Sequence, residues 1–417
     1  MKDEAQFPFR ILIVFLLVVL PASTDAIGPR RIQILAIGAT MPQMTQVVPW
    51  FTIEPSTSVS HVPTRGFGLH MTPVQYERAI RIYLPRTYED MLYYDAFVYV
   101  GGSVNYISPR QVSYLRRAVE EGGRGAFGDL GGVSVTAEIV DIWITSGIWE
   151  LFPSDAPGAV DSGLWGHAEV PYTVEVLEGR DNNPLEPFQT LDIEKVTGSY
   201  GRLIIPREGS TIYALIEGLR FKGNENPPFL VAWDYADGRT MLVAEFFNHR
   251  WFQSPPEGQN SYVVDIVVNM VLNTIGRPVH QDIPLLHLAR ERARDFHNYY
   301  TMLLSTLDFV ERFGANTVSF VSDLRELEGL AGEAEKQVLN GDLEDSIDTW
   351  DQCIEEAKAA GDRAMELRDK AMLWTYLIEW FAVLGTSMIC GIVLHAVMIR
   401  RKFYRQATTT RLEGNHP

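Results

Sequence analysis

Apolar positions in the first part of the chain fall into short runs that are separated by amphipathic segments. Residues 31–38 (RIQILAIG) and 96–100 (AFVYV) are apolar runs that lead into glycines, which is typical of buried strands. Residues 108–122 carry apolar side chains at helical spacing, with a serine and a proline at the start and a glycine at the end. Residues 124–132 (RGAFGDLGG) predict a further strand and turn. This alternation predicts a parallel sheet with helices on both faces.

Shorter strand and turn signals follow from residue 170 to about residue 215. A β-hairpin is expected over residues 228–252, with its turn at Asp237-Gly238. The apolar segment 261–276 then predicts a closing helix that stops at a glycine. Because no linker composition interrupts the region, we expect one α/β domain over residues 30–278.

From residue 284 the apolar positions recur at spacings of four and three, which is the heptad pattern of packed helices. The pattern occupies three segments, at Ala289, Ala293, Phe296, Tyr300, Leu303, Leu307 and Val310, then Phe320, Leu324, Leu327, Ala331, Ala334 and Val338, then Leu343, Ile347, Trp350, Ile354 and Ala357. Short breaks between such segments predict a three-helix bundle or coiled-coil stalk over residues 284–372. Two roles are open: a spacer that packs on itself, or a stalk that forms a homodimer or passes a signal to the tail.

The N-terminal residues 1–26 have the layout of a signal peptide. Ten apolar residues, Ile11–Leu20, follow basic residues and precede small residues at a cleavage position. This apolar core is too short to cross a bilayer, so cleavage is expected, with an uncleaved anchor as the alternative.

The C-terminal residues 374–399 predict one transmembrane helix. The twenty residues Trp380–Ile399 carry no formal charge, enough for a single crossing. Tryptophan and tyrosine cluster at one end, and four basic residues follow between 400 and 405. Aromatic residues at one interface and basic residues at the other place the tail, 400–417, in the cytoplasm. We therefore expect a single-pass protein of the cell membrane, anchored in lipid by this helix, with the bulk of the chain extracytoplasmic.

Charge and cysteine content narrow the function classes. The chain has 36 Lys and Arg against 53 Asp and Glu, a net charge of −17, which argues against nucleic acid as a partner. The two cysteines, Cys353 and Cys390, lie at different depths relative to the membrane, so no internal disulfide is expected. Cys353 could bridge two copies, or it could be an ordinary buried thiol.

Three stretches carry a family resemblance: YDAFVYVGGS at 94–103, GGRGAFGDLGG at 122–132, and DGRTMLVAEFFNHRWF at 237–252. Together they resemble the glutamine amidotransferase-like superfamily, which includes ThuA-like domains. The resemblance covers about Arg31–Ile275 and implies a flavodoxin-like α/β fold with a parallel sheet, here as an ectodomain set on the helical stalk and one C-terminal transmembrane helix.

The resemblance also implies a site, but without its nucleophile. In catalytic members a glycine pair supplies oxyanion-hole amides, an elbow supplies cysteine, and a late histidine is followed by a carboxylate. Gly101 and Gly102 match the glycine pair and His249 matches the histidine, whereas Leu130 occupies the cysteine position and Trp251 the carboxylate position. Without a thiolate no thioester forms, so no catalytic residue for glutamine hydrolysis is expected.

Glycine turns expose backbone amides that bind anions with or without a nucleophile. The carboxyl ends of parallel strands share one edge, where open α/β sheets form their crevice. The expected ligand-binding residues are Gly101, Gly102, Ser103, Asp129, Gly131, Asn248 and His249. The alternative is that the glycines serve close helix packing and Asp129 caps a turn.

The function that these features favour is a membrane-anchored extracytoplasmic protein that binds a small ligand, a glycan or a partner protein. Its layout resembles auxiliary subunits of ABC-type exporters, which suggests an accessory subunit in a membrane-protein complex. The competing hypothesis is a ThuA-like carbohydrate-active hydrolase that uses His249 with Asp129 or Glu245. Asp234 and Glu245 are a further candidate acid–base pair. Histidine spacings fit no metal site, and no phosphate loop or dinucleotide fingerprint occurs, so neither a metal nor a cofactor is expected.

Overall fold

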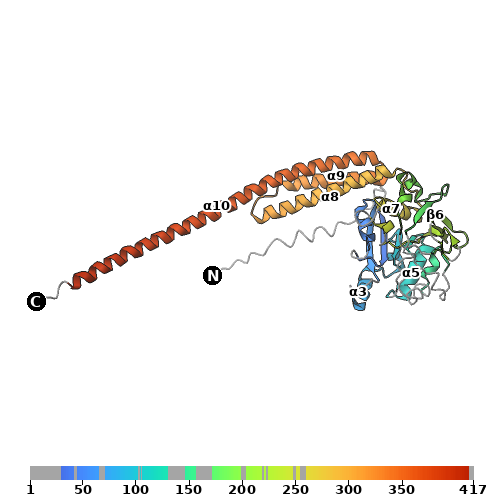
Figure 1. Ribbon diagram of the computed structural model, residues 1–417, viewed down its shortest axis with the longest axis horizontal. Helices are drawn as coiled ribbons and strands as arrows, with labels where there is room; N and C mark the ends of the chain where they lie inside the picture. The colour runs from blue at the N-terminus through green and yellow to red at the C-terminus, as the bar shows by residue number, and fades with distance from the viewer. Residues whose placement is uncertain are drawn as a thin grey trace.

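The computed structural model describes residues 30–41, 45–64, 71–101, 104, 106–129, 146–155, 171–198, 203–217, 220–221, 224–247, 250–253 and 260–412. Figure 1 shows an α/β body from which a helical arm extends, with one helix continuing far beyond the others. The predicted signal peptide, residues 1–26, lies outside the described residues.

The body is built on a mixed β-sheet, which has a parallel part followed by an antiparallel part. Among the described residues it has eight strands, in the order β2 (Thr57–Pro63), β1 (Ile32–Gly38), β3 (Ala96–Val100), β4 (Gly125–Asp129), β10 (Gly238–Val243), β9 (Pro228–Tyr235), β6 (Thr211–Glu217) and β5 (Thr173–Val176). The first five are parallel, and the last three join antiparallel. The prediction of a mostly parallel sheet is confirmed, with an antiparallel extension formed by the short strands and the hairpin.

The β9–β10 hairpin turns at Ala236 and Asp237, one residue earlier than expected, and Ala236 adopts a left-handed backbone with φ of 51°. The remaining short elements of the body are β7 (Arg220–Phe221), β8 (Asn224–Glu225) and the 3-10 turns η3 (Ile148–Leu151), η4 (Glu186–Leu191), η5 (Ile193–Lys195) and η6 (Arg250–Phe252).

Helices cover both faces of the sheet. They are α2 (Val47–Ile53) and α7 (Val263–Thr274) on one face, and α3 (Pro73–Tyr83), α4 (Tyr88–Met91) and α5 (Pro109–Glu120) on the other. Right-handed crossovers place α2 and α3 on opposite faces, because β2 and β3 lie on opposite sides of β1. The predicted start of α5 is confirmed, since the Ser108 side chain accepts a hydrogen bond from the Gln111 amide.

Aromatic side chains fill the core of the body between the sheet and its helices. Trp251, which the family resemblance placed at a carboxylate position, is fully buried, and its ring contacts those of Phe229 and Phe252 at centroid distances of 4.8 Å. Its surroundings are therefore those of a core residue.

Three helices form the arm: α8 (Ile283–Arg312), α9 (Phe320–Asn340) and α10 (Leu343–Leu412). Asp282 caps α8, and Gly341, with φ of +86°, ends α9 in the left-handed conformation that glycine tolerates. Their buried side chains form one apolar cluster around Trp350 and Cys353, both with no exposed surface. A buried Cys353 is not available to bridge two copies.

Helix α10 has two parts that differ in their surroundings. Its first part packs against α8 and α9, whereas apolar side chains from Leu373 to Tyr404 are exposed, including Trp374 at 67 % and Trp380 at 65 %. This second part contains the predicted span, residues 374–399, and is long and apolar enough to cross a membrane. In Figure 1 it is the red helix that leaves the bundle.

Candidate functional site

The carboxyl edge of the parallel strands is the first place to look for a site. Strands β1, β3, β4 and β10 all end there. Gly101 and Asp129 are described, whereas Gly102, Ser103, Leu130, Gly131, Asn248 and His249 lie outside the described residues. The structure therefore shows what holds this edge together, and the ligand role of its loops stays a prediction.

Asp129 ties three strand ends together. Its side chain is 1 % exposed, and its Oδ1 accepts a hydrogen bond from the Gly101 amide at 2.8 Å while its Oδ2 accepts one from the Phe247 amide at 2.9 Å. A buried carboxylate is stable when its oxygens are satisfied in this way. Asp129 therefore cross-links the strand ends after β3, β4 and β10.

The Glu245 carboxylate also makes a hydrogen bond within the body. It has no exposed surface, and its carboxylate accepts a hydrogen bond from the Tyr172 hydroxyl. Gly198 packs over this pair so closely that a Cβ there would lie 2.2 Å from the Tyr172 ring and 2.4 Å from the Glu245 carboxylate. The pair is a packed element of the core and offers no open carboxylate.

Asp234 and Glu245 do not form an acid–base pair. Asp234 lies beside the hairpin turn, opposite Arg239, with which it makes a 2.8 Å ion pair, and its side chain is 75 % exposed. Glu245 follows the other end of β10. The strand separates the two carboxylates by about 20 Å at ~3.3 Å per residue, so the proposed pairing is wrong.

The ends of β1 and β3 approach each other very closely. Gly38 has φ of +121°, and a Cβ at this position would lie 1.9 Å from the Val100 carbonyl oxygen. The same oxygen accepts a hydrogen bond from the Ala39 amide at 2.9 Å. Only glycine fits here, because any side chain would push the two strand ends apart.

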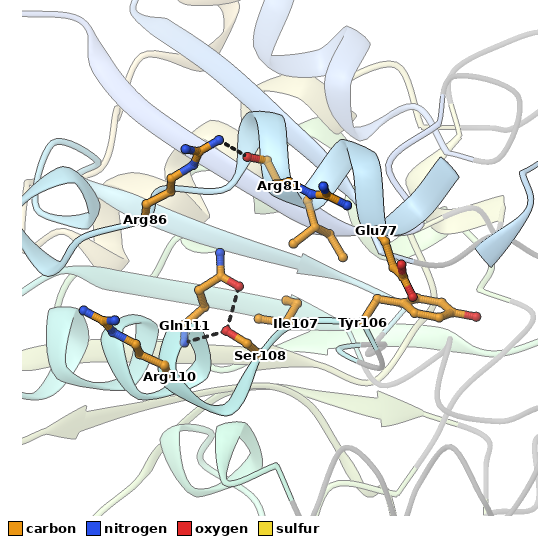
Figure 2. Close-up of a pocket in the computed structure, with 9 residues that line it drawn as sticks. Glu77, Arg81, Arg86, Tyr106, Ile107, Ser108, Arg110 and Gln111 are labelled. Atoms are coloured by element: carbon orange, nitrogen blue, oxygen red, sulfur yellow. Dashed lines mark hydrogen bonds between the residues drawn. The ribbon is translucent and has the colours of Figure 1, made fainter. Parts of the chain in front are cut away.

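A charged groove opens on the face that carries α3 and α5. It is a cavity of about 670 Å³ lined by Glu77, Ile80, Arg81, Arg86, Tyr106, Ile107, Ser108, Arg110 and Gln111, which we call the arginine groove. Figure 2 shows Glu77, Arg81 and Arg86 on one side of it, and Tyr106 to Gln111 on the other. Because residues 106–108 follow the turn after β3, the groove begins near the carboxyl edge.

Within the described residues, the arginines of the groove make no ion pair with a carboxylate. Arg86 donates to the Arg81 carbonyl at 2.9 Å, and Arg110 donates to the Tyr114 hydroxyl at 2.6 Å and lies over the Tyr114 ring. Within the part of the chain that is described, no carboxylate lies within ion-pair distance of Arg81, Arg86 or Arg110. Among the described residues, Arg81 and Arg86 therefore line the groove without an ion pair, and the Glu77 carboxylate lies on the same wall.

A stacked pair of tyrosines forms one wall of the groove. The Tyr106 and Tyr76 rings lie 5.7 Å apart and are inclined by 7°, with Tyr76 buried and Tyr106 36 % exposed. The inner ring fixes the outer one, which leaves a flat aromatic face beside the arginines. Sequence reasoning missed this groove, because Arg81 and Arg86 lie in a stretch for which no helix was predicted and only Arg110 lies near a predicted helix start.

A second charged cluster joins the body to the bundle. Arg290 of α8 is 6 % exposed and pairs with two buried carboxylates, Glu54 after α2 and Asp265 of α7. The Arg290 Nε donates to Glu54 at 2.6 Å, and His287 contacts Asp265 at 2.9 Å. We call these four residues the junction cluster. A cavity of about 330 Å³ lies beside it.

Within the junction cluster, Arg290 and Glu54 favour each other's charged forms. Burial alone would raise the pKa of Glu54, but the Arg290 guanidinium and hydrogen bonds from Ser56 hold that pKa below the usual glutamate value. Burial lowers the pKa of the neighbouring His280 and so favours its neutral form. Among the described residues, no three His, Cys, Asp or Glu side chains are placed to hold a metal ion.

The sequence held a signal for the junction cluster. Asp265, Asn269 and Asn273 stand at successive turns of an otherwise apolar helix and are fully buried. Asn269 exchanges hydrogen bonds with the His280 backbone, and Asn273 accepts from Arg239 at 2.9 Å. A polar stripe on a buried helix requires fixed partners: Asp265 and Asn269 connect α7 to α8 and the segment before it, whereas Asn273 bonds within the body.

Comparisons with known proteins give similarities among solved structures. No family model and no curated protein matches it. Among solved structures, it is similar to the cytoplasmic protein STM3548 from Salmonella typhimurium, with 13 % identity and a TM-score of 0.41 over 58 % of this chain and 98 % of that one. It is also similar to the cytoplasmic protein STM1381 from Salmonella typhimurium LT2, with 17 % identity and a TM-score of 0.42 over 58 % of this chain and 99 % of that one. At these scores neither similarity carries a functional assignment.

Proposed function

We propose that the protein is a membrane-anchored binding protein whose α/β body recognises an anionic ligand or partner without transforming it. The observation that carries this proposal is the arginine groove. In a chain of net charge −17, the guanidinium groups of Arg81, Arg86 and Arg110 line this cavity without an ion pair to any described carboxylate, which favours an external anion. Planar guanidinium groups match carboxylate, phosphate and sulfate oxygens.

The shape of the groove narrows the ligand class. The exposed face of Tyr106 offers an apolar, flat surface next to Arg81 and Arg86. Aromatic faces pack against the apolar faces of sugar rings, while arginines bind an acidic substituent. A sugar that carries a carboxylate, phosphate or sulfate group meets both requirements, and a glycan is one of the three partner classes expected from the sequence.

Helix α10 supplies the proposed attachment. Its exposed apolar part crosses the membrane in this proposal, with Trp374 and Trp380 at the outer interface and the basic residues after Ile399 at the inner one. The signal peptide, the extracytoplasmic position of the body and the cytoplasmic tail belong to the same proposal.

The strand order supports the proposed relation to amidotransferase-like domains. The parallel part, β2-β1-β3-β4-β10, follows the flavodoxin-like order 2-1-3-4-5. Both cysteines of the chain, Cys353 and Cys390, belong to α10, so the body contains no thiol nucleophile. A non-catalytic member of that superfamily would have these properties.

The surroundings of Asp129 and Glu245 argue against the hydrolase alternative. It needs Asp129 or Glu245 to exchange protons with a substrate, yet both carboxylates are buried and already accept hydrogen bonds from within the body. We therefore favour binding over hydrolysis.

The partner of the anchored protein is a separate part of the proposal. An accessory subunit would purify from mild detergent together with a multi-pass permease, and a stalk-mediated homodimer would appear as a dimer of this chain alone. Cross-linking in native membranes, followed by mass measurement of the complex, distinguishes these two assemblies.

The test of the binding proposal uses the full-length protein in lipid nanodiscs. Thermal unfolding of the body is recorded with uronic acids, sugar phosphates and sulfated sugars, and with their neutral counterparts. A ligand at a hundred times its dissociation constant stabilises the folded state by ~2.7 kcal/mol, which gives a clear shift in melting temperature. Arg81→Glu is expected to abolish the shift and higher salt to weaken it.

Arg78→Glu is the matched control, because Arg78 is an exposed arginine on the same helix that does not line the groove. Equal shifts with charged and neutral sugars, or equal losses in both variants, would refute the proposed anion site.

A further inference from the structure

Exposed apolar side chains gather at the tip of the bundle, where α8 turns back into α9. They are Phe309, Phe313, Val318 and Val321, with 38 %, 42 %, 72 % and 44 % of their surfaces exposed. The Phe309 and Phe313 rings contact each other at a centroid distance of 4.7 Å. The surfaces of soluble proteins rarely expose a cluster of large apolar side chains unless a partner or a membrane covers it.

Contacts between the parallel helices α8 and α10 show which residue of α10 lies beside this tip. Arg292 of α8 pairs with Asp351 of α10 at 2.9 Å, and Tyr299 of α8 lies under Lys358 at 5.3 Å. Both pairs are 59 residues apart. The same offset places Phe313 level with residue 372 of α10.

Residue 372 is where the exposed apolar part of α10 begins. Leu373 and Trp374 are 60 % and 67 % exposed, and Tyr376 and Trp380 follow. At a rise of 1.5 Å per residue, Phe313 lies within about 3 Å of Trp374 along the helix axis. The apolar tip and the aromatic start of the span are therefore at the same height, and Figure 1 shows the α8–α9 turn beside α10 at the point where α10 continues alone.

We propose that the α8–α9 turn is a second membrane contact, which inserts Phe313 and Val318 into the boundary between headgroups and acyl chains of the bilayer that α10 crosses. The occupant is lipid, because the patch continues directly into the lipid-facing surface of α10. Charged neighbours such as Asp308 and Arg312, which pair at 2.7 Å, remain at headgroup level. This inference rests on the proposed membrane anchor.

The contact would fix the orientation of the whole arm. One helix that crosses a bilayer leaves a bundle free to tilt, whereas a second insertion point beside the span removes that freedom. The body would then stand at a set height and angle above the surface.

The test places a single environment-sensitive fluorophore on the full-length protein in phosphatidylcholine nanodiscs. Cysteine replaces Val318 at the tip, Lys336 near the opposite end of α9, or Val383 in the span, each in a Cys353→Ala, Cys390→Ala background. Quenching is measured with spin-labelled lipid and, separately, with aqueous iodide. Labels at 318 and 383 are expected to be quenched by lipid severalfold more than the label at 336, which iodide should quench.

Three outcomes decide the matter. Lipid quenching at 318 and 383 supports the inference. Lipid quenching at 383 alone overturns the tip contact and leaves the anchor intact, whether iodide reaches 318 or a protein partner shields it. Iodide quenching at all three positions overturns the anchor and the tip contact together.

A second pair of variants guards against an effect of the label itself. Phe313→Glu should reduce lipid quenching of the label at 318 severalfold, because a charged side chain at the tip opposes insertion. Glu333→Gln, an exposed change near the other end of α9, should leave that quenching unchanged. Equal quenching in both variants would contradict the inference.

Discussion

Arg290 is the residue whose loss should disturb the molecule most. Arg290→Met keeps the length of the side chain and removes the cation that lies between two buried carboxylates, those of Glu54 and Asp265. These carboxylates are 2 % and 0 % exposed, so water cannot replace the lost guanidinium. The variant therefore carries two uncompensated charges at the junction between body and bundle.

The size of the effect follows from what remains around each carboxylate. Removing one partner of a buried ion pair typically costs about 3–5 kcal/mol. Glu54 keeps hydrogen bonds from the Ser56 amide and hydroxyl, at 3.1 and 2.6 Å, and Asp265 keeps its contact with His287. These remaining contacts place the expected loss in the free energy of unfolding at about 3–4 kcal/mol at pH 7.

The loss should depend on pH in a defined direction. In the natural protein the pKa of Glu54 is below its ordinary value of 4.5, so its contribution to stability is present above that pH and is lost as pH falls through the lowered value. Loss of the Arg290 guanidinium removes two of the influences that lower the pKa of Glu54, so burial raises this pKa in the variant above its value in the natural protein. The variant then gains stability by protonation, and that gain disappears as pH rises. The difference between the two proteins should therefore narrow between pH 7 and pH 5.

Urea unfolding of the full-length protein in nanodiscs, followed by tryptophan fluorescence at pH 7 and pH 5, measures both effects. Arg292→Met is the matched control, because the Arg292–Asp351 pair on the same helix is 38 % and 50 % exposed and should contribute at most about 1 kcal/mol. A triple variant, Glu54→Gln, Asp265→Asn and Arg290→Met, should recover most of the loss. The reasoning is refuted if Arg290→Met unfolds like the control, or if its deficit is the same at both pH values.

Two further predictions concern buried groups. Asp129→Asn should lower the free energy of unfolding by about 2–3 kcal/mol, because the amide keeps one acceptor oxygen and turns a donor toward a backbone N–H. A variant that is as stable as the natural protein in urea would show that Asp129 is not a structural cross-link. Burial raises the pKa of Cys353 to about 11, so about one thiol in a thousand is ionised at pH 8, and iodoacetamide should modify it only in unfolding concentrations of urea. Rapid labelling of native protein in a Cys390→Ala background would contradict the buried position.

Much of the fold could be predicted because its signals are local. The strand over 96–100 is a continuous apolar run, and the start of α5 is marked by Ser108 and a proline, which act within one turn. The helical spacings after residue 284 likewise depend on neighbours three and four positions away. The antiparallel half of the sheet was less visible, because β5 and β6 are short strands of mixed polarity that depend on their partner strands.

The site was harder to predict from the sequence, because its residues are far apart in the chain and meet only in the folded protein. Asp129 was singled out from the sequence, but its bond to the Phe247 amide spans 118 residues, so its cross-linking contact could not be predicted. The Glu54–Arg290 pair spans 236 residues. In the same way, the arginine groove exists only because α3 and α5 lie side by side on one face of the sheet. Residue type and spacing do not encode these distances.

The relative position of the groove and the junction favours the spacer role over a signalling role for the bundle. The groove lies over α3 and α5, whereas α8 attaches beside α2 and α7 on the other face of the sheet. No described residue lines both the groove and the junction cavity. Without a shared contact, anion binding and bundle position should be independent, as expected of a spacer.

Anion affinity in the triple junction variant measures this independence, because that variant alters the junction while remaining folded. We expect the affinity to equal that of the natural protein. A severalfold change would mean that the two sites are thermodynamically linked. By reciprocity, a bound anion would then shift α8 and hence the continuous helix α10, and the arm would be a signalling element and not a spacer.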